Sequence, residues 1–98
     1  MAVEGKRKRY ISFVIEGGST ERRGMISAIR RNFSSKEYEE IEPWLTVFTG
    51  EKGIIRCDHR YKERAVEILN GLEVGGGKVK TLITSGTIKK AKKSLEEG

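Results

Sequence analysis

The order of short apolar runs and helically spaced segments is the feature that most constrains how this chain can fold. Each apolar run spans only a few residues and ends at glycine, charged or turn-forming residues, which is typical of strands. The predicted strands are residues 10–15, 44–49, 53–57 and 79–84. Apolar residues recur at helical spacing over 21–33 and again after Asp58, as far as Leu72, and these segments are predicted helices. A lysine-rich amphipathic helix is expected after Thr87.

The resulting order is strand, helix, strand, strand, helix, strand, followed by the C-terminal helix. This order predicts an α+β fold of the ferredoxin-like (RRM-like) split βαβ class. A four-stranded antiparallel sheet would carry two helices on one face, and the C-terminal helix would be an addition. We expect a single domain over residues 1–98, with a basic N-terminal tail at 1–9 and the basic C-terminal helix at 87–97.

The predicted strands carry apolar side chains on both faces of the sheet. Strict alternation in the second strand places Leu45 and Val47 on one face and Trp44 and Phe48 on the other. Because two helices cover only one face, the second face needs its own cover. The C-terminal helix is the nearest candidate for this role, and a protein partner is the next.

Two segments between these elements are interpreted as irregular. Residues 34–43 are acidic and lack a sustained period, which indicates a loop or a single helical turn before Pro43. The glycine-rich stretch at 74–78 has no helix after it, so it is interpreted as a flexible connector. The stretch Glu16 to Gly24 is interpreted as a structural turn in preference to an anion-binding loop, because Glu16 and Glu21 would repel an anion.

Composition restricts the class of protein. The chain is 35% charged and 36% hydrophobic, a balance that excludes a disordered polymer and a membrane protein. It contains no run of about 18 apolar residues and no signal-like apolar segment near its first residue, so a cytoplasmic location without membrane contact is expected. The net charge of +6 is concentrated towards the two ends, which favours an acidic partner and nucleic acid in particular.

The basic side chains are therefore the candidate contacts to RNA phosphates. The candidates are Lys6, Arg7, Lys8, Arg9, Arg22, Arg23, Arg30, Arg31, Lys89, Lys90 and Lys93. The third predicted strand has isoleucine and Arg56 where an RNA recognition motif has stacking aromatic residues. Binding to the RNA backbone and shape is therefore favoured over base stacking.

The residues of the turn Ser85-Gly86-Thr87 can be interpreted as a helix cap, as a phosphate contact, or as both. A nucleophilic Ser85 would need a base, and His59 is the only histidine of the chain. Cys57 has no cysteine partner for a disulfide or a metal site, so no metal or cofactor is expected on the chain. The rival hypothesis is a small anion-binding hydrolase of the acylphosphatase type, with Arg22 or Arg23 as its anion clamp, although no asparagine lies near the middle strands to position water.

Four stretches in order resemble the family of ribonuclease P protein component 2, the small protein subunit of archaeal and eukaryotic ribonuclease P. They are "KRYISFVI", "PWLTVF", "GIIRCDHRY" and "SGTIKKAKK", and they span nearly the whole chain. The resemblance implies an RRM-like fold and a non-catalytic RNA-binding subunit of a tRNA-processing ribonucleoprotein. In that family the ribonuclease P RNA, with bound Mg²⁺, acts as the endoribonuclease that removes the 5′ leader of precursor tRNA.

The resemblance also implies protein partners. These are ribonuclease P protein component 3 and a second copy of the chain, as a homodimer within a heterotetramer. We interpret Tyr10, Trp44 and Phe48 as the partner interface, since apolar residues on a second sheet face need such a cover.

Overall fold

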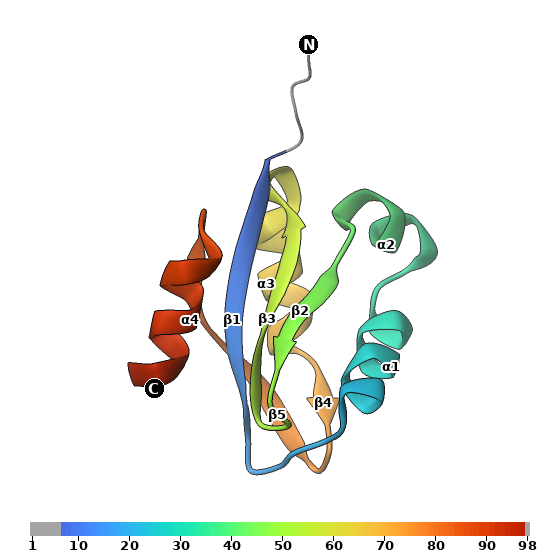
Figure 1. Cartoon of the computed structure of the whole chain (residues 1–98). Coiled ribbons are helices and arrows are strands. Elements are labelled where there is room, and N and C mark those ends of the chain that lie inside the picture. The colour runs from blue at the N-terminus through green and yellow to red at the C-terminus, as the bar shows by residue number, and fades with distance from the viewer. Residues whose placement is uncertain (1–6, 98) are drawn as a thin grey trace.

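An antiparallel sheet lies at the centre of the molecule, as the computed structural model in Figure 1 shows. The structure describes residues 7–97. Within that range the sheet has five strands in the order β2-β3-β1-β5-β4. The strands are β1 (Lys8–Glu16), β2 (Trp44–Phe48), β3 (Lys52–Asp58), β4 (Glu73–Val74) and β5 (Gly77–Ser85). The predicted α+β class and antiparallel pairing are confirmed, whereas the predicted number of strands is wrong.

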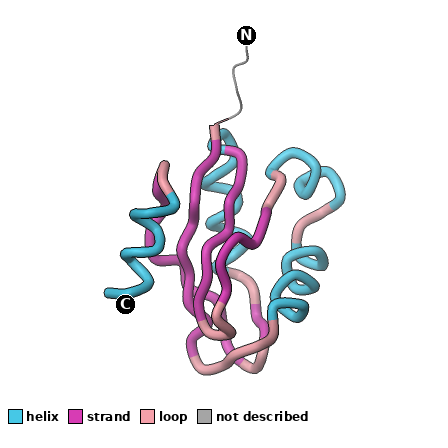
Figure 2. The backbone as a smooth tube through the Cα atoms, in the orientation of Figure 1, coloured by secondary structure: helices cyan, strands magenta, loops and turns pink. Residues whose placement is uncertain are grey.

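Helices lie on both sides of this sheet (Figure 2). They are α1 (Arg22–Asn32), α2 (Ser35–Ile41), α3 (Lys62–Asn70) and α4 (Ile88–Glu97), with a 3-10 turn, η1 (His59–Tyr61), before α3. The main core joins β1 and β3 to α1 and α3, through fully buried residues such as Phe13, Ile55, Met25 and Leu69. No helix within residues 7–97 is long and apolar enough to cross a membrane.

Helix α4 covers the opposite face of the sheet, as predicted for the C-terminal helix. Ala91 and Leu95 pack on the fully buried Ile54, and partly buried residues, among them Tyr10 and Leu82, pack against this second cluster. Burial of these side chains against one another is the main force that attaches α4 to the sheet. Helix α4 of the same chain therefore covers most of the apolar side chains on the second face of the sheet.

Polar contacts fix the position of α4 along the sheet. The hydroxyl groups of Ser12 on β1 and Ser94 on α4 lie 2.7 Å apart and share a hydrogen bond. At the end of the helix, Lys52 Nζ donates to the carbonyl oxygen of Leu95 at 2.9 Å. The last carbonyl groups of a helix lack intrahelical partners and carry partial negative charge, so an ammonium group is a favourable partner there.

The fifth strand arises where a flexible connector was predicted. Residues Glu73 and Val74 pair with Lys78 and Gly77 as a short hairpin. The turn uses Gly75 and Gly76 at φ of +63° and +84°, a conformation that suits glycine and matches the twist of a two-residue hairpin. Three successive glycines near this turn therefore serve a tight turn rather than flexibility.

Residues 34–43 also differ from the prediction, because they form the two-turn helix α2. Ser34 Oγ accepts from the N–H of Glu37, and the Glu37 carboxylate accepts from the N–H of Ser34, which is a capping box. Ile41 is the buried residue of this helix and packs into the main core. A helix of seven residues contains too few apolar positions to show a clear period.

A bulge in β2 changes the predicted distribution of its side chains. The register against β3 shifts between Leu45 and Val47, so an extra residue, Thr46, separates them. Val47 therefore joins the cluster under α4, while Phe48 packs against the main core and stacks on Phe13 with ring centroids 6.2 Å apart. The prediction that Trp44 and Phe48 share a face is wrong, because strict alternation fails across a bulge.

Candidate nucleic-acid interface

The turn Ser85-Gly86-Thr87 caps helix α4. Ser85 Oγ accepts a hydrogen bond from the N–H of Thr87 at 3.1 Å, and Thr87 Oγ1 accepts from the N–H of Lys90 at 3.4 Å. These two bonds satisfy N–H groups that a helix start would otherwise leave without a partner. The capping interpretation of this turn is confirmed.

The lysines of α4 form the outer side of the helix. Lys89, Lys90, Lys92 and Lys93 are all exposed. None of them forms an ion pair within the described part of the chain, where the ion pairs involve other basic residues. The structure therefore presents four unpaired ammonium groups on one helix.

The charges of α4 oppose the helix dipole. No acidic residue lies in its first turn, which instead contains Lys89 and Lys90, while Glu96 lies near its end. Cations near a helix N-terminus are unfavourable by a few tenths of a kcal/mol to about 1 kcal/mol each. The intrinsic stability of α4 does not explain why lysines occupy its first turn. An anion bound near this turn would offset their unfavourable interaction with the helix dipole.

The basic end of β1 lies next to the start of α4. The Arg9 guanidinium is near Gly86, with Nη1 3.6 Å from the position that a Cβ on that glycine would occupy. Tyr10 pairs directly with Ser85 across the two strands, which brings the two segments together. Arg7 is exposed at the beginning of this strand, and Lys6 lies outside the described residues. Arg9 therefore lies close to the turn before α4, and the exposed lysines of α4 form a basic surface on the other side of that turn.

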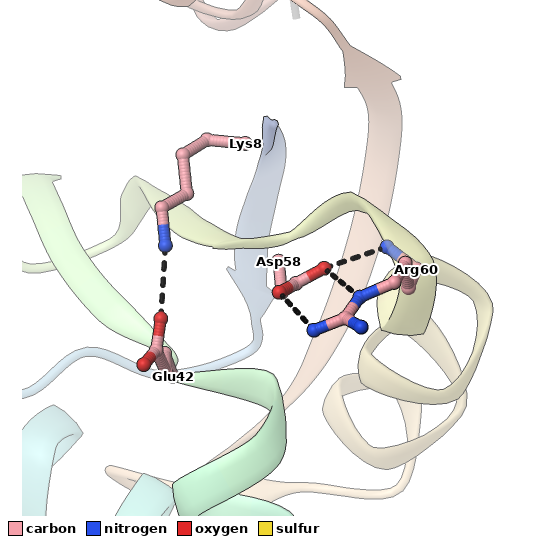
Figure 3. Close-up of polar contacts among 4 residues, drawn as sticks. All are labelled: Lys8, Glu42, Asp58 and Arg60. Atoms are coloured by element: carbon pink, nitrogen blue, oxygen red, sulfur yellow. Dashed lines mark hydrogen bonds and ion pairs between the residues drawn. The ribbon is translucent and has the colours of Figure 1, made fainter. Parts of the chain in front are cut away.

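Acidic groups near this end are neutralised by partners (Figure 3). Lys8 Nζ lies 2.9 Å from the Glu42 carboxylate. Asp58, which is 1% exposed, accepts from the backbone N–H of Arg60 at 2.9 Å and from Nε and Nη2 of the same guanidinium at 3.2 and 3.0 Å. These hydrogen bonds with Arg60 lower the pKa of Asp58 to about 2, from an ordinary value of 3.8. The spacing Asp-X-Arg just before the second predicted helix was the available sequence signal for this pair.

The arginines of α1 do not join that surface. Helix α1 packs on the main-core face of the sheet and α4 on the other, so the two basic helices are separated by the sheet itself. Arg22 and Arg30 line a groove beside β2, and Arg31 lines a shallow hollow next to the glycine-rich turns. Arg23 is exposed. The predicted set of basic residues is thus divided over two faces.

The residues predicted for a partner interface lie in three different environments. Tyr10 is partly buried under α4, and Phe48 is partly buried against the main core. Trp44 is 60% exposed at the start of the edge strand β2. Of the three, Trp44 alone presents a large aromatic surface to solvent.

The geometry around Arg22 bears on the hydrolase hypothesis. Arg22 Nη2 donates to the carbonyl oxygen of Leu45, which directs the guanidinium towards β2. Gly18 of the candidate anion loop lies against the second glycine-rich turn, where an added Cβ would clash with the Gly75 oxygen. This loop therefore serves close packing of two backbones, which supports its interpretation as a structural turn.

Two other candidates for chemistry are the single cysteine and a possible cluster of metal-ligating side chains. Cys57 is fully buried, and burial raises the pKa of its thiol to about 11. Within residues 7–97, no group of three or more His, Cys, Asp and Glu side chains is placed to hold a metal ion.

Comparison with known proteins gives no further assignment. No model of a known protein family matches the chain, and no curated protein matches it in sequence.

Proposed function

We propose that this chain is a non-catalytic, RNA-binding protein subunit of ribonuclease P. The observation that carries the proposal is the row of exposed, unpaired lysines on α4, with Arg9 of β1 near Gly86 just before this helix. In this role the chain would support the catalytic RNA of a cytoplasmic ribonucleoprotein that removes the 5′ leader of precursor tRNA.

The arrangement of charges supports phosphate as the ligand. Lys89 and Lys90 lie in the first turn of α4, where the helix dipole disfavours them, and Arg9 lies near Gly86, just before that turn. A phosphate group would interact favourably with all three cations and with the positive end of the helix. The nearby Asp58 carboxylate is hydrogen-bonded to Arg60, so its charge is compensated locally.

The arrangement of the sheet supports contact with the RNA backbone rather than with bases. The pairing order β2-β3-β1-β5 is compatible with a ferredoxin-like, RRM-like fold to which β4 adds an edge. In an RNA recognition motif the open sheet face stacks bases. Here α4 covers that face over β1, where it buries Tyr10 in part, so lysines take the place of a stacking platform.

In this proposal the RNA catalyses the cleavage, and the protein chain does not. The RNA, with its bound Mg²⁺, would supply the cleavage chemistry, and the side chains of this chain would hold phosphates in place. Ribonuclease P protein component 3 and a second copy of the chain are the proposed protein partners.

Charge reversal on α4 tests the RNA-binding part of the proposal. The variant K89E/K90E/K93E should bind precursor tRNA and ribonuclease P RNA more weakly, with a flatter dependence of log K on log salt. The slope should fall by about 0.9 for each duplex phosphate that the variant no longer neutralises, hence by about 2.7 if all three lysines bind phosphates.

A charge-matched control separates local contact from net charge. The variant K36E/K62E/K78E changes three lysines outside α4 and has the same net charge. It should retain a salt slope close to that of the unmodified chain. Equal slopes for the two triple variants would remove α4 from the RNA interface.

Reconstitution tests the assignment to ribonuclease P. The RNA and component 3 are assayed for precursor-tRNA cleavage at limiting Mg²⁺, with and without this chain. We expect cleavage to increase when the chain is added and to lose that increase with K89E/K90E/K93E. Cleavage that does not respond to the chain would refute the assignment, even if RNA binding persists.

A further inference from the structure

A groove of about 280 Å³ lies between α1, α2 and the start of β2. Ile26 and Ile29 of α1 line its apolar part. Arg22 and Arg30 lie at the α1 side, Tyr38 contributes aromatic surface from α2, and Trp44 borders the groove at the start of β2. The groove is separated by the sheet from the lysines of α4, so it is a different surface from the proposed RNA interface.

Helix periodicity explains why α1 presents this combination. Arg22, Ile26, Ile29 and Arg30 are separated by four, three and one residues, which places them on one side of an α-helix. The Arg30 guanidinium lies over the Tyr38 ring, 5.9 Å from its centroid, and this contact connects α1 to α2. An apolar stripe is thus flanked by two cationic groups.

The edge of β2 is closed to an added strand at this point. Arg22 Nη2 donates a hydrogen bond to the carbonyl oxygen of Leu45, so an α1 side chain already engages the backbone of this edge strand. The bulge between Leu45 and Val47 further interrupts the regular edge. A ligand of this groove must therefore be recognised through side chains rather than by strand addition.

The charge around the groove disfavours RNA. Helix α2, which forms one side, contains Glu39 and Glu40 as exposed acidic groups. Its other glutamate, Glu37, is bound by Arg64 at 2.7 Å, which lowers the pKa of the Glu37 carboxyl group. A continuous phosphate backbone would meet repulsion along α2, whereas a protein segment can direct carboxylates to α1 alone.

We propose that this groove binds an amphipathic helix of a partner protein. Aliphatic side chains of that helix would enter between Ile26 and Tyr38, and carboxylates along one flank would pair with Arg22 and Arg30. Trp, Tyr and Arg are the residue types that carry most energy in protein interfaces, and helix-in-groove binding uses apolar anchors at helical spacing. This inference does not depend on RNA binding by α4.

Trp44 supplies the measurement, because it is the only tryptophan in the chain. The probe is a synthetic amphipathic helix with leucines in one stripe and glutamates along its flank, added to the full chain. We expect a saturable blue shift of Trp44 emission as the exposed ring is covered. A peptide with lysines in place of the glutamates should bind about tenfold more weakly.

Charge-reversal variants distinguish specific peptide binding in the groove from non-specific binding to the chain. Arg30→Glu should weaken the glutamate peptide about tenfold and strengthen the lysine peptide. Arg23→Glu, an exposed position on the same helix that does not line the groove, should leave both affinities unchanged. The α4 variant K89E/K90E/K93E should also leave them unchanged, so failure of the RNA proposal is separable from failure of this one.

Three results would overturn the inference. The first is no change in Trp44 emission with the glutamate peptide. The second is an emission change with single-stranded RNA that Arg30→Glu abolishes, which would make the groove an RNA site. The third is an emission that depends on the concentration of the chain alone, which would assign the groove to a second copy.

Discussion

Replacing Asp58 with asparagine tests how the corner between β3 and α3 is stabilised. The Asp58 carboxylate accepts three hydrogen bonds from Arg60, one from its backbone N–H and two from its guanidinium. The next residue, His59, donates its backbone N–H to the Arg7 oxygen at 3.0 Å, so this corner also attaches the start of β1. Asparagine retains an oxygen acceptor for the backbone N–H but removes the charge that the guanidinium pairs with.

The magnitude follows from the pKa of Asp58. A decrease from 3.8 to about 2 in the folded state corresponds to about 2.4 kcal/mol, at 1.36 kcal/mol per pH unit. The Arg60 side chain is 61% exposed, so solvent screens part of this interaction. We therefore expect Asp58→Asn to lower the free energy of unfolding by about 1–2 kcal/mol at neutral pH.

The pH dependence gives the sharper test. Because the folded pKa lies below the unfolded pKa, the stabilisation is complete above about pH 5 and is lost as the pH falls towards 2. Urea unfolding followed by circular dichroism should show a difference between the original chain and Asp58→Asn that narrows over this range. Asp58→Ala should lose about 1 kcal/mol more at neutral pH, because it also removes the cap. A difference that is absent at pH 7, or constant down to pH 2.5, would refute the reasoning.

Two further substitutions test packing, each with a control on the same element. Leu95→Ala should lower the free energy of unfolding by about 2–3 kcal/mol, because Leu95 is 7% exposed and anchors α4. In urea unfolding, the control Lys92→Ala at an exposed position should leave the free energy of unfolding unchanged. Equal effects of the two substitutions would show that α4 is not held by the Leu95 contact. Gly75→Ala should cost about 2 kcal/mol or more, because φ is +63° and the new Cβ would clash with the Ser19 oxygen. Gly76→Ala has the positive φ but nothing within 4 Å, so in the same assay it should cost only about 1 kcal/mol; a loss as large as that of Gly75→Ala would contradict the close contact.

The sequence by itself determined the features that depend on local periodicity and capping. The four main strands, the helix over Arg22–Asn32 and the amphipathic α4 follow from apolar spacing of two and 3.6 residues. The cap at Ser85 and Thr87 follows from hydroxyl groups placed just before an amphipathic run. The cover on the second sheet face was predictable from apolar residues on both sides of the strands.

Tertiary structure alone decided which side chains come together. A single extra residue at Thr46 exchanges the faces that Val47 and Phe48 occupy relative to Leu45, and no local pattern marks that position. The separation of Arg22 and Arg30 from the α4 lysines arises because α1 and α4 pack on opposite faces of one sheet. Charge along the chain indicates that a surface is basic, but contacts between residues distant in sequence determine whether those charges form one binding surface or two.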